Sequence, residues 1–255
     1  MLGIGQIANR IAELIRGAMP FAIVSNGTNP DGTSRGMSSF EKIMCYNGIT
    51  EASLAGKNLI FVREGRYTQQ VLIKEDYRLI IGSHDAIIYT NDTHIAWHQT
   101  STATSIVTIG LTFLGKSGGT GGFRTMQLDG VNGAFIFGRF GDADTTKVLV
   151  NSSSSQNWFV GCVWNGTVDG GWLVQCSGGY NKFIGCKSYG SGNHGVYIPG
   201  TQSNIIVGNT FQGTTVNVQL DSSSAYNIVA CNQCDASITN NSGTSNNVIA
   251  NNAMR

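Results

Sequence analysis

Two aspartates, Asp144 and Asp169, come closest in this chain to an acid–base pair. Asp144 stands in the segment Gly141-Asp-Ala-Asp144-Thr145 and Asp169 in Gly166-Thr-Val-Asp169, 25 residues further along the chain. In a chain that coils with a repeat equal to their separation, the two carboxylates would stack on one face. Such a pair can act as acid and nucleophile when their environments separate their pKa values. The sequence therefore offers one candidate catalytic pair, with ordinary turn aspartates as the alternative.

Two other pairs have the spacing of metal ligands or redox groups. His94 and His98 are separated by twice the strand period, so both imidazoles would lie on one face of a strand. Metal binding by this pair requires a further ligand, and a surface strand is the alternative. Cys231 and Cys234 lack a second cysteine pair or a nearby histidine. We therefore expect neither a metal site nor a cofactor.

The elements that would position these groups belong to a repeat. Asparagines recur at nearly constant intervals, each opening a short apolar segment: Asn157, Asn181, Asn204, Asn227 and Asn247. The second residue after each asparagine is apolar in every copy: Phe159, Phe183, Ile206, Val229 and Ile249. A fixed period of this size indicates a solenoid, and segments rich in β-branched and aromatic residues read as strands. Like residues of successive coils would lie about 4.8 Å apart, so the amides can form a hydrogen-bonded ladder.

Composition narrows the class of protein. Charged residues make up 12% of the chain and the formal net charge is +1, so bulk charge gives no argument for nucleic-acid binding. No apolar run is long enough to span a membrane. Arg10, Glu13 and Arg16 interrupt the apolar stretch that a signal peptide would need. Cys162 and Cys186 occupy the same position in adjacent coils, which predicts a stack of small buried thiols.

We expect two parts in the chain. Residues 1–36 comprise an amphipathic helix over 3–19 and a loop rich in turn formers over 25–36. The helix caps the solenoid, docks on a partner or bundles with copies of itself. Residues 37–255 form the solenoid, opened by a second helix over 38–55 that covers its first coil.

The first coils resemble a known family. The run Asn58-Leu-Ile-Phe-Val-Arg-Glu-Gly-Arg-Tyr-Thr-Gln-Gln-Val-Leu-Ile73, followed by Leu79-Ile-Ile-Gly82 and Ile87-Ile88, is similar to the opening coils of the pectin-lyase-like superfamily. The similarity extends over about residues 38–115, and the asparagine ladder continues it. The resemblance implies an all-β fold, a right-handed parallel β-helix whose coils have the length of the asparagine repeat. It also implies contact with carbohydrate, since the superfamily includes polysaccharide lyases, pectin esterases and the trimeric tailspikes and virion spikes of bacteriophages.

The same resemblance tests the candidate catalytic pair. Pectin methylesterases carry their carboxylates in Gly-Tyr-Gln-Asp-Thr and Gly-Thr-Val-Asp-Phe-Ile-Phe-Gly, which the segments around Asp144 and Asp169 resemble. Ala143 replaces the glutamine, however, and the Phe-Ile-Phe-Gly run is missing after the second aspartate. The family's later arginine has no counterpart, because the only arginine after Arg139 is Arg255. Lyase chemistry would need a basic residue facing a calcium-binding acidic cluster, and the acids here are scattered. We therefore expect no enzymatic activity.

The outward positions of the repeat indicate a partner. Residues alternate in and out along a strand, so the positions on either side of each core residue face outward. In the last three coils these are all apolar: Ile205, Val207, Ile228, Ala230, Val248 and Ala250. A monomer rarely exposes such a patch, so we expect self-association along this face. Phage spikes of the superfamily use threefold symmetry, although the sequence alone does not distinguish three copies from two.

Several aromatic residues are expected on the surface, where they can stack on sugar rings or pack between coils: Trp97, Trp158, Trp164, Trp172, Tyr189 and Tyr197. Among them Trp97, Trp164, Tyr189 and Tyr197 are the candidate carbohydrate-binding residues. The leading hypothesis is a structural virion protein of a bacteriophage: a homotrimeric spike, tailspike-like fibre or capsid-decoration protein. Residues 3–19 would dock on other virion proteins and the solenoid would contact a host-surface glycan, with no nucleic-acid binding and no membrane insertion. The alternatives are a carbohydrate-active enzyme using Asp144 and Asp169, and a secreted adhesin.

Overall fold

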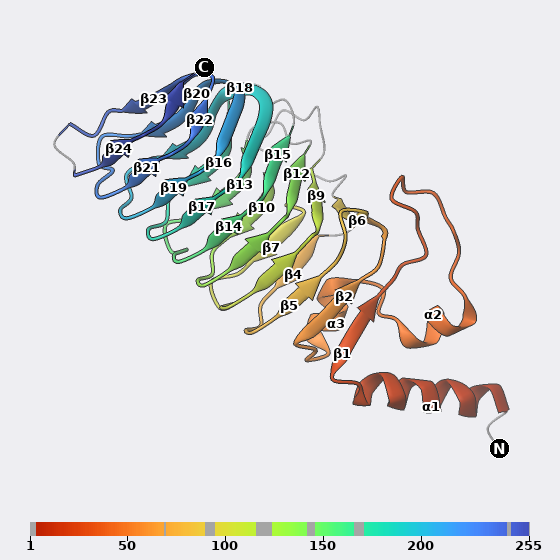
Figure 1. The fold of residues 1–255 in the computed structure, drawn as a ribbon. Helices are drawn as coiled ribbons and strands as arrows, with labels where there is room; N and C mark the ends of the chain where they lie inside the picture. Colours follow the sequence, from red (N-terminus) through yellow and green to blue (C-terminus); the bar gives the residue numbers. More distant parts are fainter. Residues whose placement is uncertain are drawn as a thin grey trace.

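The computed structural model describes residues 4–68, 70–89, 95–115, 124–141, 146–165, 171–243 and 246–254. The chain winds into a parallel β-helix, with successive coils stacked from the N-terminal helices to the C-terminus (Figure 1). The predicted all-β solenoid, with coils of the length of the asparagine repeat, is therefore confirmed.

One side of the coil is a ten-stranded sheet in which every strand pairs in parallel with the next coil. Its strands, in spatial order, are β1 (Phe21–Val24), β2 (Leu59–Val62), β5 (Leu79–Ile81), β8 (Val107–Ile109), β11 (Ala134–Ile136), β14 (Trp158–Val160), β17 (Lys182–Ile184), β19 (Ile205–Val207), β21 (Ile228–Ala230) and β24 (Val248–Ala250). The order follows the sequence, so each coil adds one strand.

A fifteen-stranded sheet forms the rest of the coil in two arms. The first arm contains β3 (Gly65–Tyr67), β6 (Ala86–Tyr89), β9 (Thr112–Leu114), β12 (Arg139–Gly141) and β15 (Val163–Asn165). The second contains β4 (Val71–Ile73), β7 (Trp97–Gln99), β10 (Arg124–Leu128), β13 (Thr146–Val150) and β16 (Trp172–Cys176). The arms meet in the long strand β18 (Lys187–Ile198), which pairs with β15 and β16, and the sheet ends in β20 (Thr210–Leu220), β22 (Gln233–Cys234), β23 (Ser237–Asn240) and β25 (Ala253–Met254).

The asparagine ladder is confirmed. The Oδ1 of Asn181 accepts hydrogen bonds from the backbone N–H of Asn157 at 3.0 Å and from its side-chain amide at 3.1 Å. Asn204 and Asn227 repeat this arrangement on the next coils, at 2.9 Å from the backbone nitrogen in each case. Asn247 continues it, accepting from the backbone N–H of Asn227 at 2.8 Å. The first four asparagines are buried, so the ladder satisfies polar groups that lie inside the coil.

A second ladder lies at the next corner, just after each strand of the ten-stranded sheet. The Nδ2 groups of Asn209, Asn232 and Asn252 each donate to a carbonyl of the preceding coil at 3.0 Å. In the coils before them the thiols of Cys162 and Cys186 donate to the corresponding carbonyls, at 3.1 and 3.3 Å. The predicted thiol stack is therefore part of a longer column of corner donors, and its cysteines are free and buried.

Aromatic rings fill the middle of the core in two stacks. Phe159 lies between Phe135 and Phe183, with ring centroids 5.2 and 5.0 Å away. Phe140 lies between Phe113 and Trp164, at 5.1 and 6.0 Å. Stacking is possible because the parallel register places like residues of successive coils directly above one another.

The N-terminal region differs from the prediction in two ways. The first expected helix is confirmed as α1 (Ile4–Ala18), but the second divides into α2 (Ser39–Met44) and α3 (Ile49–Leu54). Ser38 caps α2 through a capping box with Glu41, and α3 packs against β1, β2 and β4. The strand β1, which the sequence did not predict, pairs with β2, so the solenoid begins at Phe21, inside the segment assigned to residues 1–36. The proposed boundary at residue 36 is therefore wrong.

Glu41 joins the loop before α2 to the first coil. Its Oε1 lies 2.8 Å from Arg35 Nη2 and 2.6 Å from Arg63 Nη1, and Ser25 Oγ donates to the same oxygen at 3.1 Å. The hydrogen bond from Arg35, followed by that from the Ser38 backbone, holds the pKa of Glu41 well below its ordinary value. The carboxylate thus connects β1, the loop and the turn after β2.

Candidate functional site

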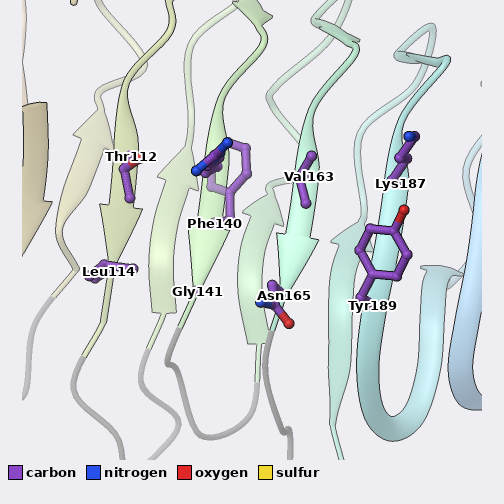
Figure 2. A pocket seen from close by; sticks show the side chains of 9 residues that line it. Thr112, Leu114, Phe140, Gly141, Val163, Asn165, Lys187 and Tyr189 are labelled. Carbon is purple, nitrogen blue, oxygen red and sulfur yellow. The ribbon is translucent and has the colours of Figure 1, made fainter. Parts of the chain in front are cut away.

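The first arm of the fifteen-stranded sheet carries a groove on its outward face, over β9, β12, β15 and β18 (Figure 2). The pairing of these strands aligns one row of side chains, Thr112, Arg139, Val163 and Lys187, of which Thr112 is buried and the other three reach the surface. A second row contains Leu114, Gly141, Asn165 and Tyr189. Because Gly141 has no side chain and Val163 has a short one, the middle of the face is hollow, with a volume of about 440 Å³.

Two cations border this hollow. Arg139 and Lys187 are both exposed and stand two strands apart in the same row, on either side of Val163. Strand spacing places them about 10 Å apart along the coil axis. Within the part of the chain that the structure describes, neither forms an ion pair.

The walls of the groove add an aromatic ring and polar groups. Tyr189 has 38% of its surface exposed, and Figure 2 shows its ring beside Lys187 on the same strand. The exposed side chain of Asn165 lies next to it on β15. A hollow of this size, with an aromatic wall and a few fixed polar groups, is typical of a small-molecule or saccharide site.

The second arm carries another aromatic and polar cluster. The rings of Trp172 and Tyr197 are stacked with centroids 4.5 Å apart, and His194 lies 5.6 Å from Trp172. The Tyr197 hydroxyl donates to Asp221 at 2.8 Å. Burial, together with the bond to Asp221, raises the pKa of Tyr197, and burial lowers the pKa of His194. The candidate Tyr197 is therefore half-buried beneath Trp172, and only part of its ring can reach a ligand.

His98 forms a hydrogen bond with a carboxylate. Its Nε2 lies 2.7 Å from Asp129 Oδ2, and that carboxylate also accepts from the amides of Gln127 and Asn151. Burial raises the pKa of Asp129, but the hydrogen bonds from His98, Asn151 and Gln127 outweigh it and leave the pKa below its ordinary value. His98 thus has an acidic partner. The expected second imidazole, His94, lies outside the described residues.

The prediction that Trp97 and Trp164 bind carbohydrate is wrong. Trp97 and Trp164 are 0% and 1% exposed, so neither ring can stack on a sugar. Trp97 packs edge-on against Phe113, and Trp164 ends the stack of aromatic rings above Phe140. Side chains alternate between the inside and the outside of the coil along a strand, and both tryptophans occupy inward positions, where a bulky ring fills the core. Tyr189 keeps the exposure that was expected of it.

The catalytic candidates Asp144 and Asp169 also lie outside the described residues. Of the residues that the structure does describe, no three of the His, Cys, Asp and Glu side chains form a metal-binding group. Cys231 is exposed and Cys234 is buried, so the two thiols of this pair face different environments. None of the described helices is long and apolar enough to cross a membrane.

The apolar residues predicted to face outward do so, and the face they belong to is larger than expected. All six are half-buried or exposed, with Val248 at 51% and Ile228 at 39%. The same alternation continues through the whole ten-stranded sheet, where each strand has two outward positions. Of these twenty positions nineteen are apolar, and the exception is Lys182. Lys182 Nζ lies 3.8 Å from the ring centroid of Trp158, on the neighbouring strand.

Fold and surface together define a parallel β-helix protein with one apolar side and one grooved side. No protein-family model and no curated protein sequence matches this chain. Among solved structures, the chain is similar to one named "Geobacillus virus E2 - ORF18", at 14% sequence identity and a TM-score of 0.41. That similarity covers 76% of this chain and 52% of the other, so the chain spans about half the length of that protein.

Proposed function

We propose that this protein is a structural component of a bacteriophage particle, a β-helical spike or decoration protein that assembles through its ten-stranded sheet. The observation that carries the proposal is the apolar face of that sheet. Ten strands at the usual spacing form a strip roughly 43 Å long. Apolar surface of this extent is seldom left in water by a soluble monomer.

The occupant that fits this strip best is a second copy of the same chain. The strip is regular, with apolar residues at nineteen of its twenty outward positions, so an identical strip has matching spacing. A homotrimer, the arrangement of the phage spikes that the sequence resembles, would bury one such strip per subunit. The role is structural and non-enzymatic, and the groove on the other side of the coil remains open to a host-surface glycan.

Solution mass tests the assembly. The subunit mass is 27.1 kDa, and we expect light scattering to give three times that value at micromolar concentration. Ile228→Glu should dissociate the assembly, because the new carboxylate would lose its hydration in an apolar interface. Ser222→Glu, at an exposed turn, is the matched control and should leave the mass unchanged. A wild-type monomer would overturn the proposal.

Activity assays test the non-enzymatic role. The protein should not shorten or de-esterify polysaccharides. Turnover by the wild type that disappears in Asp144→Asn or Asp169→Asn, with mass and fold unchanged, would instead establish the carbohydrate-active enzyme.

A further inference from the structure

The geometry of the groove over β9, β12, β15 and β18 points to a defined class of ligand: we infer that it binds an acidic oligosaccharide. The inference deepens the proposed glycan contact, since it names the chemistry that the groove selects. It starts from Arg139 and Lys187, two exposed cations that border the hollow and form no ion pair within the described residues.

The positions of the cations suit charges that are spaced along a chain. Arg139 and Lys187 lie two strands apart, about 10 Å along the coil axis, with only Val163 between them. The guanidinium of Arg139 can hold a carboxylate or phosphate with two parallel hydrogen bonds, whereas Lys187 acts as a point charge. A polymer that carries one acid on alternate sugar units can reach both cations in an extended form.

The remaining lining favours sugar rings over other anionic polymers. The backbone of the groove floor is already paired strand to strand, so an extended peptide would find no free edge to join. Nucleic acid is disfavoured because its affinity requires many phosphate contacts and the chain has a net charge of only +1. Sugar rings, in contrast, can lie on the exposed ring of Tyr189 and place their hydroxyls against its phenol and the amide of Asn165.

Gly141 keeps the floor of the groove open. A Cβ added there would lie 3.0 Å from Leu114 Cδ2, so a side chain at this position would occupy the hollow. Filling the neighbouring position, Val163, with a larger side chain obstructs the same space from an outward-facing site that is half-exposed. This gives a way to block the groove without changing charge.

The test is calorimetric titration of the full-length protein with matched probes. A hyaluronan tetrasaccharide carries one carboxylate per disaccharide, fully N-acetylated chitotetraose is a neutral counterpart, and a glycerol phosphate oligomer supplies phosphate charge. We expect binding of the acidic saccharide, no binding of the neutral one, and weaker affinity as salt is raised. The glycerol phosphate oligomer distinguishes the sources of charge: tighter binding of this probe than of hyaluronan would identify phosphate-bearing glycans as the ligand class.

Variants assign the binding to the groove. Arg139→Gln and Lys187→Gln should each weaken the affinity about ten-fold or more, the loss expected for one charge-assisted hydrogen bond. Val163→Trp should abolish binding by filling the hollow, and Lys74→Gln, which removes an exposed cation elsewhere, should not change it. Circular dichroism on each variant checks the fold.

Three outcomes would overturn the inference: equal affinity for the neutral and acidic tetrasaccharides, no binding of either acidic probe, or wild-type affinity in both charge variants. The result is separable from that of the proposed assembly. If the protein is an oligomer that binds no acidic probe, only the inference about the groove is wrong. If it is a monomer that binds an acidic probe, only the proposed assembly is wrong.

Discussion

At the scale of single residues, the coil depends on side chains that replace missing backbone partners. Asn204 illustrates this: its Oδ1 accepts from the backbone N–H of Asn181, and its Nδ2 donates to Thr201 and Asn227. Each of these groups is buried or part-buried, where water cannot substitute for a lost partner. The ladder therefore explains why a polar residue recurs at an interior position of the coils that contain β14, β17, β19, β21 and β24.

Asn204→Ala should be strongly destabilising. It leaves the buried N–H of Asn181 without an acceptor, and we expect a loss of about 3 kcal/mol in the free energy of unfolding. Chemical denaturation measures it. Asn246→Ala is the matched control, because Asn246 is exposed beside the end of the ladder and its removal should cost less than about 0.5 kcal/mol.

The hydrogen bonds of Glu41 should make the stability of the fold depend on pH. Its pKa is lowered by the bonds from Arg35 and the Ser38 backbone, so it stabilises the fold above the ordinary value of 4.5 and loses this contribution as the pH falls below it. Glu41→Gln should therefore lower the melting temperature at pH 7, and the difference from wild type should shrink toward pH 3. Thermal scans across this range measure the difference. A difference that is independent of pH, or a similar effect in the exposed Glu64→Gln, would contradict this account.

At the scale of elements, the coil turns before and after each strand of the ten-stranded sheet, and at most of these corners one residue has a positive φ. Left-handed residues precede most strands of the ten-stranded sheet: Tyr77, Ser105, Asn132, Gln156, Tyr180, Ser203 and Tyr226. Others follow the strands: Gly110, Phe137, Gly161, Gly185, Gly208, Cys231 and Asn251. This conformation disfavours residues with a Cβ, so the second corner is occupied by glycine in several coils.

Cys231→Gly should stabilise the protein. Cys231 has a φ of +56° at a position where four earlier coils have glycine, and removing its Cβ relieves about 1 kcal/mol of strain. Gly185→Ala, which adds a Cβ at the same corner, should destabilise the protein by a similar amount, because the φ of Gly185 is +61°. No atom lies within 4 Å of the added Cβ, so the backbone conformation alone would cause the loss. Denaturant midpoints for both variants test the pair. Shifts of the same sign would exclude backbone strain as the cause.

At the scale of the whole molecule, the helix α1 precedes β1, the first strand of the apolar face, and packs against α2. Its exposed apolar residues include Leu14 at 73% and Ile11 at 52%, and its C-terminal end is tied to the body by Lys57, whose Nζ donates to the carbonyls of Gly17 and Met19. The solenoid itself begins at β1, after this helix. We propose that α1 docks on another component of the particle.

Removing residues 1–18 should leave the oligomer intact. Since the strip lies on the ten-stranded sheet, we expect the same number of subunits by light scattering and a melting temperature within a few degrees of the full chain. Loss of the assembly on truncation would assign the contact to α1 and contradict the role of the sheet. The Ile228→Glu variant, measured in parallel, shows that the assay detects dissociation.

The sequence by itself determined the repeat. Because each coil contacts only its neighbours, the chain must place the same kind of residue at the same position once per coil, and this periodicity revealed the asparagine ladder and the strand that follows each asparagine. The second ladder carried the same signal, in the sixth residue of each segment, but its change from Cys162 and Cys186 to Asn209, Asn232 and Asn252 concealed it. The strand β1 has no repeat partner upstream, and four apolar residues alone do not distinguish a strand from a helix.

Only the tertiary structure decided which residues share a surface. The sequence predicts Trp97 and Trp164 on the surface, whereas in the registers of β7 and β15 both side chains lie inside the coil. The groove joins four strands from four coils, and Arg139 and Lys187 lie in one row only through the parallel pairing of β12, β15 and β18. A one-residue shift along any strand would invert its inward and outward faces. A solenoid sequence therefore records its period, whereas its surfaces arise from the register between coils.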